Sequence, residues 1–279
     1  MGLDPDPAAL ERERFGPDTE SAVDTADAAT TAASAVSAHC LDLIGRAGPA
    51  CVAIKPQLAC FERLGAPGWA ALSEVCEAGR EAGLLVVADG KRGDVPVTAR
   101  AYAQALFGGT ETPWGPVPGL GADAITTNPL LGRDALEPLI EAAGKAGAGV
   151  FALVRTSNPG AADLQDLDTA GLPLHERIAI IVDDLAPRLA GSSGLSGMGA
   201  VVGATEPRHL ARLRQLMPRS IFLIPGVGAQ GGRPQDLGPA FSAGPGSALV
   251  AASRSIASDP DPGGAAERLR AAIWDVSAA

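Results

Sequence analysis

Short apolar runs alternate with longer helix-forming segments along the 279-residue chain. The apolar runs are rich in β-branched and aliphatic residues, which is typical of buried parallel strands. They predict strands over residues 2–4, 50–54, 84–88, 124–127, 149–154, 200–203, 221–224 and 247–252. The segments between them predict helices over residues 19–46, 68–82, 96–107, 133–146, 173–190, 207–216 and 265–275. Segments 108–121 and 191–199 are rich in glycine, proline or serine and are expected to be loops.

Strands that alternate with helices imply right-handed parallel crossovers. Eight such units in this length favour an α/β fold, a single (β/α)8 TIM barrel over residues 1–279, over a doubly wound sheet. Active sites of these barrels lie at the carboxyl ends of the strands. The polar residues of this chain gather there, namely Asp4, Lys55, Asp89, Lys91, Thr127, Asn128, Arg155, Thr156, Ser157, Thr205, the segment 225–232 and Arg254.

The segment that follows the third predicted strand carries the densest charge. Asp89, Lys91, Arg92 and Asp94 lie within six positions, directly after an apolar run. In an extended chain residues 89 and 91 point to the same side, so we expect Asp89 and Lys91 to project together from the strand end. A structural ion pair at the rim would explain one Asp–Lys pair. An Asp-x-Lys-Arg-x-Asp array after a buried strand favours catalysis instead, because buried charges are costly unless they are paired.

Two later segments indicate a phosphate site. The glycine-rich run PGVGAQGG at residues 225–232 follows the seventh predicted strand, and Arg254 follows the eighth. Barrels often bind phosphate with these two loops, where glycines let backbone N–H groups approach the anion and an arginine supplies a forked cation. The alternative is a glycine-rich loop that only changes the direction of the chain and binds no anion. The placement of both features favours a monophosphate ligand.

Composition and charge narrow the class of protein. The net charge of −10 disfavours a nucleic-acid partner. No apolar run approaches the length of a membrane span, and residues 1–10 have no features of a secretory signal, so we expect a cytoplasmic protein without membrane contact. The cysteines show no CxxC spacing and are expected to be free thiols. The three histidines lie far apart in the sequence, and no metal site is predicted.

Six segments in order resemble the orotidine 5′-phosphate decarboxylase family, specifically its longer bacterial group with a lysine–arginine–glycine–aspartate run. They are GLDP at 2–5, AIKPQLACFE at 53–62, ADGKRGDVPVT at 88–98, TSNPGA at 156–161, VVGAT at 201–205 and PGVGAQGG at 225–232. The resemblance implies a carbon–carbon lyase that converts orotidine 5′-monophosphate to UMP without a cofactor, the last step of de novo pyrimidine nucleotide synthesis. It also implies a homodimer.

The resemblance also implies residue roles. Lys55, Asp89, Lys91 and Asp94 match the family's charged catalytic array, in which Lys91 would donate a proton to the C6 carbanion. The implied substrate-binding residues are Asp4 for the ribose, Ser157 for the pyrimidine, Gln230 between base and phosphate, Arg254 for the phosphate, and Pro225 and Gly228 in the glycine-rich loop. Asp94 and Thr98 would reach across the dimer interface into the partner's site.

The chain departs from the family pattern in places. Gly90 replaces a common alanine, and Pro96 and Val97 replace smaller residues. Family members carry a full first strand before GLDP, so we expect either a truncated first strand or a start upstream of Met1. Two other functions stay open from the residues. One is a Mg²⁺-dependent sugar-phosphate decarboxylase or aldolase of the same barrel superfamily. The other is a non-catalytic nucleotide-binding barrel.

Overall fold

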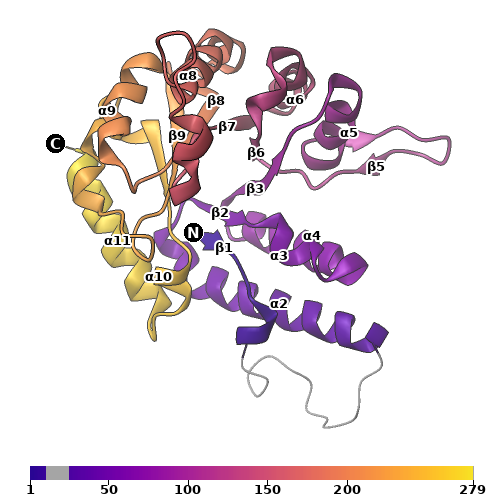
Figure 1. The fold of residues 1–279 in the computed structure, drawn as a ribbon. Helices are drawn as coiled ribbons and strands as arrows, with labels where there is room; N and C mark the ends of the chain where they lie inside the picture. Colours follow the sequence, from indigo (N-terminus) through magenta and orange to yellow (C-terminus); the bar gives the residue numbers. More distant parts are fainter. Residues whose placement is uncertain (11–24, 279) are drawn as a thin grey trace. The chain divides into compact units, whose positions relative to one another are not determined.

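The computed structural model describes residues 1–10 and 25–278, so residues 19–24 of the predicted helix over 19–46 lie outside the described residues. Eight strands form one sheet in the order β1-β2-β3-β6-β7-β8-β9-β10, which is their order along the chain. The described pairings within this sheet are parallel, and helices connect most successive strands (Figure 1). Strands in chain order with helical crossovers define the (β/α)8 class, which confirms the predicted fold class.

The chain forms two compact units, which we describe separately. The first unit comprises Met1–Gly90 and Ser253–Glu267, and the second comprises Lys91–Ala252 and Arg268–Ala279. Along the chain, one boundary falls within β3 (Leu85–Arg92), one falls directly after β10 (Ala248–Ala251), and one falls within α11 (Pro262–Ser277). A single domain over residues 1–279 stays a prediction.

In the first unit, β1 pairs with β2 and β2 pairs with β3. Helix α2 packs against α4 (Figure 1). The unit's other elements are β1 (Gly2–Leu3), η1 (Pro7–Ala9), α2 (Thr25–Ala47), η2 (Gly48–Ala50), β2 (Ala53–Pro56), α3 (Leu58–Glu62), α4 (Gly65–Glu81) and α10 (Arg254–Ala257).

Helix α4 lies close to the sheet of the first unit because of a glycine on its inner face. A Cβ atom at Gly79 would lie 2.4 Å from Cδ1 of Ile54 in β2, so a larger residue would push the helix away. The helix ends where Gly83 adopts a φ of +76°. The N–H of Leu84 then bonds to the carbonyl of Gly79 at 2.9 Å, and the chain turns directly into β3.

The second unit holds the remaining strands and the helices between them. Its core is mostly aliphatic and includes Ile125, Leu139 and Val150, together with the buried rings of Phe151 and Phe222. Its helices and strands are α5 (Pro96–Leu106), β4 (Gly109–Thr110), β5 (Val117–Pro118), β6 (Ala124–Thr127), η3 (Pro129–Leu131), α6 (Arg133–Ala146), β7 (Gly149–Arg155), η4 (Pro159–Ala161), α7 (Ala162–Gln165), α8 (Leu174–Leu185), η5 (Ala186–Leu189), β8 (Ser196–Val202), α9 (Pro207–Leu216), β9 (Ser220–Pro225), η6 (Pro234–Asp236), η7 (Gly238–Phe241), η8 (Pro245–Ser247) and β10 (Ala248–Ala251).

Several predicted segments differ from the structure. The strand predicted over 50–54 lies at Ala53–Pro56. The expected loop over 108–121 contains an antiparallel hairpin of β4 and β5, which extends away from α5 (Figure 1). The expected loop over 191–199 ends early, because β8 already begins at Ser196. The third strand runs to Arg92 rather than ending at residue 88, so the charged residues Asp89 and Lys91 belong to the strand itself.

Candidate active site

A cluster of charged side chains lies at the carboxyl ends of the first three strands, within the first unit. Lys55 Nζ lies 2.6 Å from Asp89 Oδ2 and 3.9 Å from Asp4 Oδ1. Lys55 and Asp89 are buried, with exposed fractions of 9% and 5%, whereas Asp4 is exposed. A buried pair of this kind contributes little to stability on its own, because desolvation offsets the attraction. Its presence at the strand ends therefore favours a functional role.

Gln57 joins this cluster, and sequence reasoning missed it. Its Nε2 donates a hydrogen bond of 3.2 Å to Asp89 Oδ2, the oxygen that also accepts from Lys55. The backbone brings them together, since Gln57 forms an isolated parallel bridge with Asp89. The available signal was the two-residue spacing from Lys55, which places residues 55 and 57 on one face of an extended chain.

Asp4 and Arg254 line the same cavity of about 590 Å³ in the first unit. Asp4 follows β1, Arg254 begins α10, and both residues are exposed. Helix α2 contributes His39 and Cys40 to the wall. Burial raises the pKa of the Cys40 thiol, so at neutral pH this cysteine is an uncharged part of the wall rather than a nucleophile.

In the second unit, Lys91 has a left-handed backbone conformation, with a φ of +48°. Its N–H donates to Thr126 Oγ1 at 2.9 Å, and its side chain is exposed. The prediction that Asp89 and Lys91 project to one side assumed an extended backbone through residue 91. The left-handed φ ends that regular alternation at Lys91, so the common direction of the two side chains stays a prediction. Such a conformation is unfavourable for a residue other than glycine, and strain of this kind is concentrated at functional sites.

The loop after Lys91 is held from the end of β6. Thr127 Oγ1 donates to the Arg92 carbonyl at 2.7 Å, and the N–H of Asn128 donates to the same oxygen at 2.8 Å. Asp94 is half-buried, and its Oδ1 accepts from the N–H of Val95. Thr98 lies exposed in the first turn of α5.

Ser157 and Gln230 meet within the second unit. Ser157 Oγ donates to Gln230 Oε1 at 2.8 Å, and the Ser157 carbonyl accepts from Thr205 Oγ1 at 3.2 Å. Two glycines allow this approach. A Cβ atom at Gly203 would lie 2.7 Å from the Ser157 Cα, and one at Gly226 would lie 3.2 Å from the Ser157 Cβ. The structure therefore brings together the two residues predicted to bind the base.

The glycine-rich loop begins at Pro225, whose carbonyl accepts from the N–H of Ala204 at 2.9 Å. Its turn is closed by a bond of 2.9 Å from the N–H of Gly228 to the carbonyl of Gly232. Gly228 has a φ of +79°, a conformation that glycine adopts without strain. Gly228 and Gln230 are exposed.

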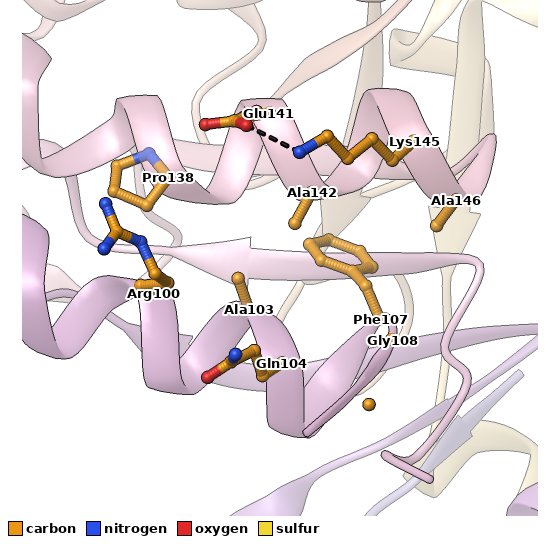
Figure 2. A pocket seen from close by; sticks show the side chains of 11 residues that line it. Arg100, Ala103, Gln104, Phe107, Gly108, Pro138, Glu141, Ala142, Lys145 and Ala146 are labelled. Atoms are coloured by element: carbon orange, nitrogen blue, oxygen red, sulfur yellow. Dashed lines mark hydrogen bonds and ion pairs between the residues drawn. The ribbon is translucent and has the colours of Figure 1, made fainter. Parts of the chain in front are cut away.

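A second cavity of about 540 Å³ lies between α5 and α6 and contains none of the predicted site residues (Figure 2). Phe107 and several alanines form part of its wall, and Lys145 pairs with Glu141 at 2.6 Å beside it. Among residues 1–10 and 25–278, no three His, Cys, Asp or Glu side chains are grouped so that they could hold a metal ion. Within the same residues, no helix is both long and apolar enough to cross a bilayer.

The sequence profile of the orotidine 5′-phosphate decarboxylase / HUMPS family matches residues 18–269. The chain belongs to this family. It is 43% identical over 227 residues to the orotidine 5′-phosphate decarboxylase of Rhodopirellula baltica, and the aligned part covers 80% of this chain and 73% of the relative. It is 46% identical over 217 residues to that of Deinococcus radiodurans, covering 77% and 75%. The OMP decarboxylase structure from Leishmania donovani matches with a TM-score of 0.72 and 34% identity, covering 100% of this chain and 93% of that one.

Membership of the decarboxylase family confirms the resemblance drawn from the six sequence segments, and with it the class of enzyme, a carbon–carbon lyase. The predicted residues fall into two groups. Asp4, Lys55, Asp89 and Arg254 belong to the first unit, and Lys91, Asp94, Thr98, Ser157, Pro225, Gly228 and Gln230 belong to the second. The roles of these residues stay predictions.

Proposed function

We propose that this chain decarboxylates orotidine 5′-monophosphate to UMP without a cofactor, as a single domain over residues 1–279. Within a chain of this family, the observation that supports the proposal best is the buried Lys55–Asp89 pair with Asp4 and Gln57 around it. These side chains bring two carboxylates, one ammonium and one amide together at the strand ends. The arrangement suits a polar, multiply charged ligand.

In this proposal Lys91 is the catalytic acid. Loss of CO2 from C6 leaves a carbanion in the plane of the pyrimidine ring, where the ring π system cannot delocalise it. The barrier must then fall through positioned charge, on the order of 20 kcal/mol in all. The Lys91 ammonium would stabilise the carbanion and then donate the proton. Asp89 and Asp94 would keep Lys91 charged, and Lys55 would limit the repulsion between these two carboxylates.

The remaining predicted residues would bind the parts of the nucleotide that do not react. Ser157 and Gln230 would contact the base, and Asp4 would accept from the ribose hydroxyls. Arg254 and the backbone of the loop from Pro225 through Gly228 would bind the phosphate. Binding energy from the phosphate can stabilise the transition state when it orders the loops over the ring.

We also propose a homodimer in which Asp94 and Thr98 complete the partner's site. Around these two residues apolar side chains are exposed, since Val95 directly before α5 is 52% exposed and Val97 in its first turn is 81% exposed. Contiguous apolar exposure beside polar residues is typical of an interface.

The experiment that tests the reaction is the absorbance change when orotidine 5′-monophosphate is added to the purified protein in the presence of EDTA. We expect conversion to UMP. Activity that requires added Mg²⁺ would favour the metal-dependent sugar-phosphate enzyme instead, and tight UMP binding without turnover would favour the non-catalytic barrel. Lys91→Ala should abolish turnover and still bind UMP, so substantial activity in that variant would refute the role of Lys91.

Mixing two inactive variants tests the shared site. If Asp94 acts in the partner's site, a hybrid of Lys91→Ala and Asp94→Ala subunits has one intact site, and turnover should return on mixing. Each variant incubated alone under the same conditions is the control. A mixture that stays inactive, although a labelled subunit shows that exchange took place, would place Asp94 in the site of its own chain.

A further inference from the structure

A buried arginine lies behind the loop that carries Ser157. Arg155, the last residue of β7, is 6% exposed and binds both carboxylate oxygens of Asp166. Its Nε lies 2.9 Å from Oδ1 and its Nη2 lies 3.0 Å from Oδ2. Its Nη1 donates to the Thr156 carbonyl at 2.9 Å. One guanidinium therefore connects the strand end, the next residue and a carboxylate eleven positions along the chain.

Gln165 bonds to Thr156 in the same loop. Its Oε1 accepts from the N–H of Thr156 at 2.8 Å, and its Nε2 donates to Thr156 Oγ1 at 3.0 Å. His175 in α8 contacts the end of the loop at residues 165 and 166. Its Nδ1 lies 2.8 Å from the Gln165 carbonyl and 3.2 Å from Asp166 Oδ1. Thr156 is thus held on both its backbone N–H and its carbonyl, directly before Ser157.

We propose that Arg155 and Asp166 are positioning residues that aim the Ser157 hydroxyl at the pyrimidine. This inference rests on the proposed function, in which Ser157 contacts the base. Arg155 donates to the Thr156 carbonyl directly before Ser157 and is held by Asp166, whereas the Ser157 hydroxyl itself bonds to Gln230 on the opposite loop. The pair would therefore act through the position of Thr156 and Ser157.

An ion pair suits this task better than apolar packing. A forked arginine–carboxylate contact fixes both distance and direction, while apolar contacts leave the orientation of a loop less defined. Hydrogen bonding from Arg155 holds the pKa of Asp166 below its usual value, so the carboxylate is charged at neutral pH. The nearby Glu176 carboxylate has its own partner, since it pairs with Arg212 at 2.6 Å.

Ligands with and without a base separate this role from a structural one. UMP carries the pyrimidine, whereas ribose 5-phosphate carries only the sugar and phosphate. In the variant Asp166→Asn we expect affinity for UMP to fall about tenfold, the loss of one well-placed hydrogen bond, and affinity for ribose 5-phosphate to stay unchanged. For orotidine 5′-monophosphate we expect KM to rise more than kcat falls. Calorimetry and steady-state kinetics measure these changes.

A double-mutant cycle shows whether Asp166 acts through Ser157. In the background of Ser157→Ala, the further change Asp166→Asn should have no additional effect on UMP affinity. Arg155→Lys keeps the charge without the fork, and we expect it to behave as Asp166→Asn does. The matched control is Asp184→Asn on α8, which removes the charge from an exposed contact with Arg133 and should leave both affinities unchanged.

Equal losses for UMP and ribose 5-phosphate, unchanged UMP affinity, or additive effects in the cycle would each overturn the inference while leaving the proposed function intact. A wild-type protein that neither binds UMP nor turns over orotidine 5′-monophosphate would refute the proposed function, and this inference with it. The midpoint of thermal unfolding of each variant identifies a general loss of folding, which would lower both affinities together.

Discussion

Replacing Lys55 with methionine should destabilise the protein strongly, because the change removes the Lys55 ammonium from the buried Asp89 carboxylate. The two groups lie 2.6 Å apart at the ends of β2 and β3, and both are more than nine-tenths buried. Methionine has nearly the length of lysine and fills most of the same space. The main loss is therefore electrostatic rather than a loss of packing.

The expected loss of stability follows from the attraction within the pair and the cost of desolvating its ions. At 2.6 Å and an effective dielectric constant near 20, the attraction amounts to about 6 kcal/mol. Desolvation costs several kcal/mol for each ion, so the intact pair contributes close to nothing. Removing one partner of a buried pair costs about 3–5 kcal/mol. The hydrogen bond from Gln57 to Asp89 remains and offsets about 1 kcal/mol, so we expect a loss of about 3 kcal/mol.

The second change, Asp89→Asn, tests the cause. A neutral amide needs no cation, so the double variant should recover most of the loss, to within about 1 kcal/mol of the wild type, although it should be inactive. Unfolding in urea at pH 7, followed by circular dichroism, gives the free energies. Lys145→Met is the matched control, since Lys145 forms an exposed pair with Glu141 at the same distance, 2.6 Å, and its loss should not be measurable. The reasoning would be refuted if Lys55→Met were as stable as the wild type. It would also be refuted if the double variant were no more stable than Lys55→Met.

Three further changes test other parts of the structure. Gly203→Ala should lower UMP affinity about tenfold or more in calorimetry, because the new Cβ would lie 2.7 Å from the Ser157 Cα and displace it; unchanged affinity would contradict this placement. Arg214→Met should lower the free energy of unfolding by at least about 3 kcal/mol in urea, since four buried carbonyls lose their donor; a smaller loss would mean that water replaces it. Arg155 lowers the pKa of Asp166, so that pair stabilises the fold above the usual carboxyl pKa of about 4, and the contribution is lost as the pH falls through the lower folded-state pKa. The stability difference between wild type and Asp166→Asn should therefore shrink in acid titrations below about pH 4, and a difference independent of pH would refute the ion pair.

The sequence predicted the order of strands and helices well because both depend on local pattern. Pro96 begins α5 as expected, since proline lacks the N–H that the first helical turn leaves unpaired. The hairpin of β4 and β5 was missed because each strand has only two residues, too few for a recognisable alternation. The end of β3 was missed for a related reason. Charged residues normally end a buried strand, and here they continue it to Arg92.

The sequence suggests candidate site residues but not their contacts. Strand ends and glycine-rich loops identify Asp89 and Ser157, because their positions follow from the order of elements along the chain. Their hydrogen-bond partners lie in other parts of the sequence. Asp89 bonds to Lys55, 34 positions earlier, and Arg155 bonds to Asp166 across a loop whose path depends on Gln165 and His175.

A buried charge requires a partner, and this requirement is physical and can be stated from the sequence alone. Which partner satisfies it depends on register and loop path. The parallel register of β1 and β2 sets Gly2 opposite Lys55, and the bridge from Gln57 to Asp89 sets the next strand, so Lys55 lies within reach of the carboxylates on both sides. A shift of one residue between β2 and β3 would turn Lys55 and Asp89 to opposite faces of the sheet, and a shift between β1 and β2 would separate Lys55 from Asp4 in the same way. The strand register thereby constrains the charged cluster as strictly as the identity of its residues does.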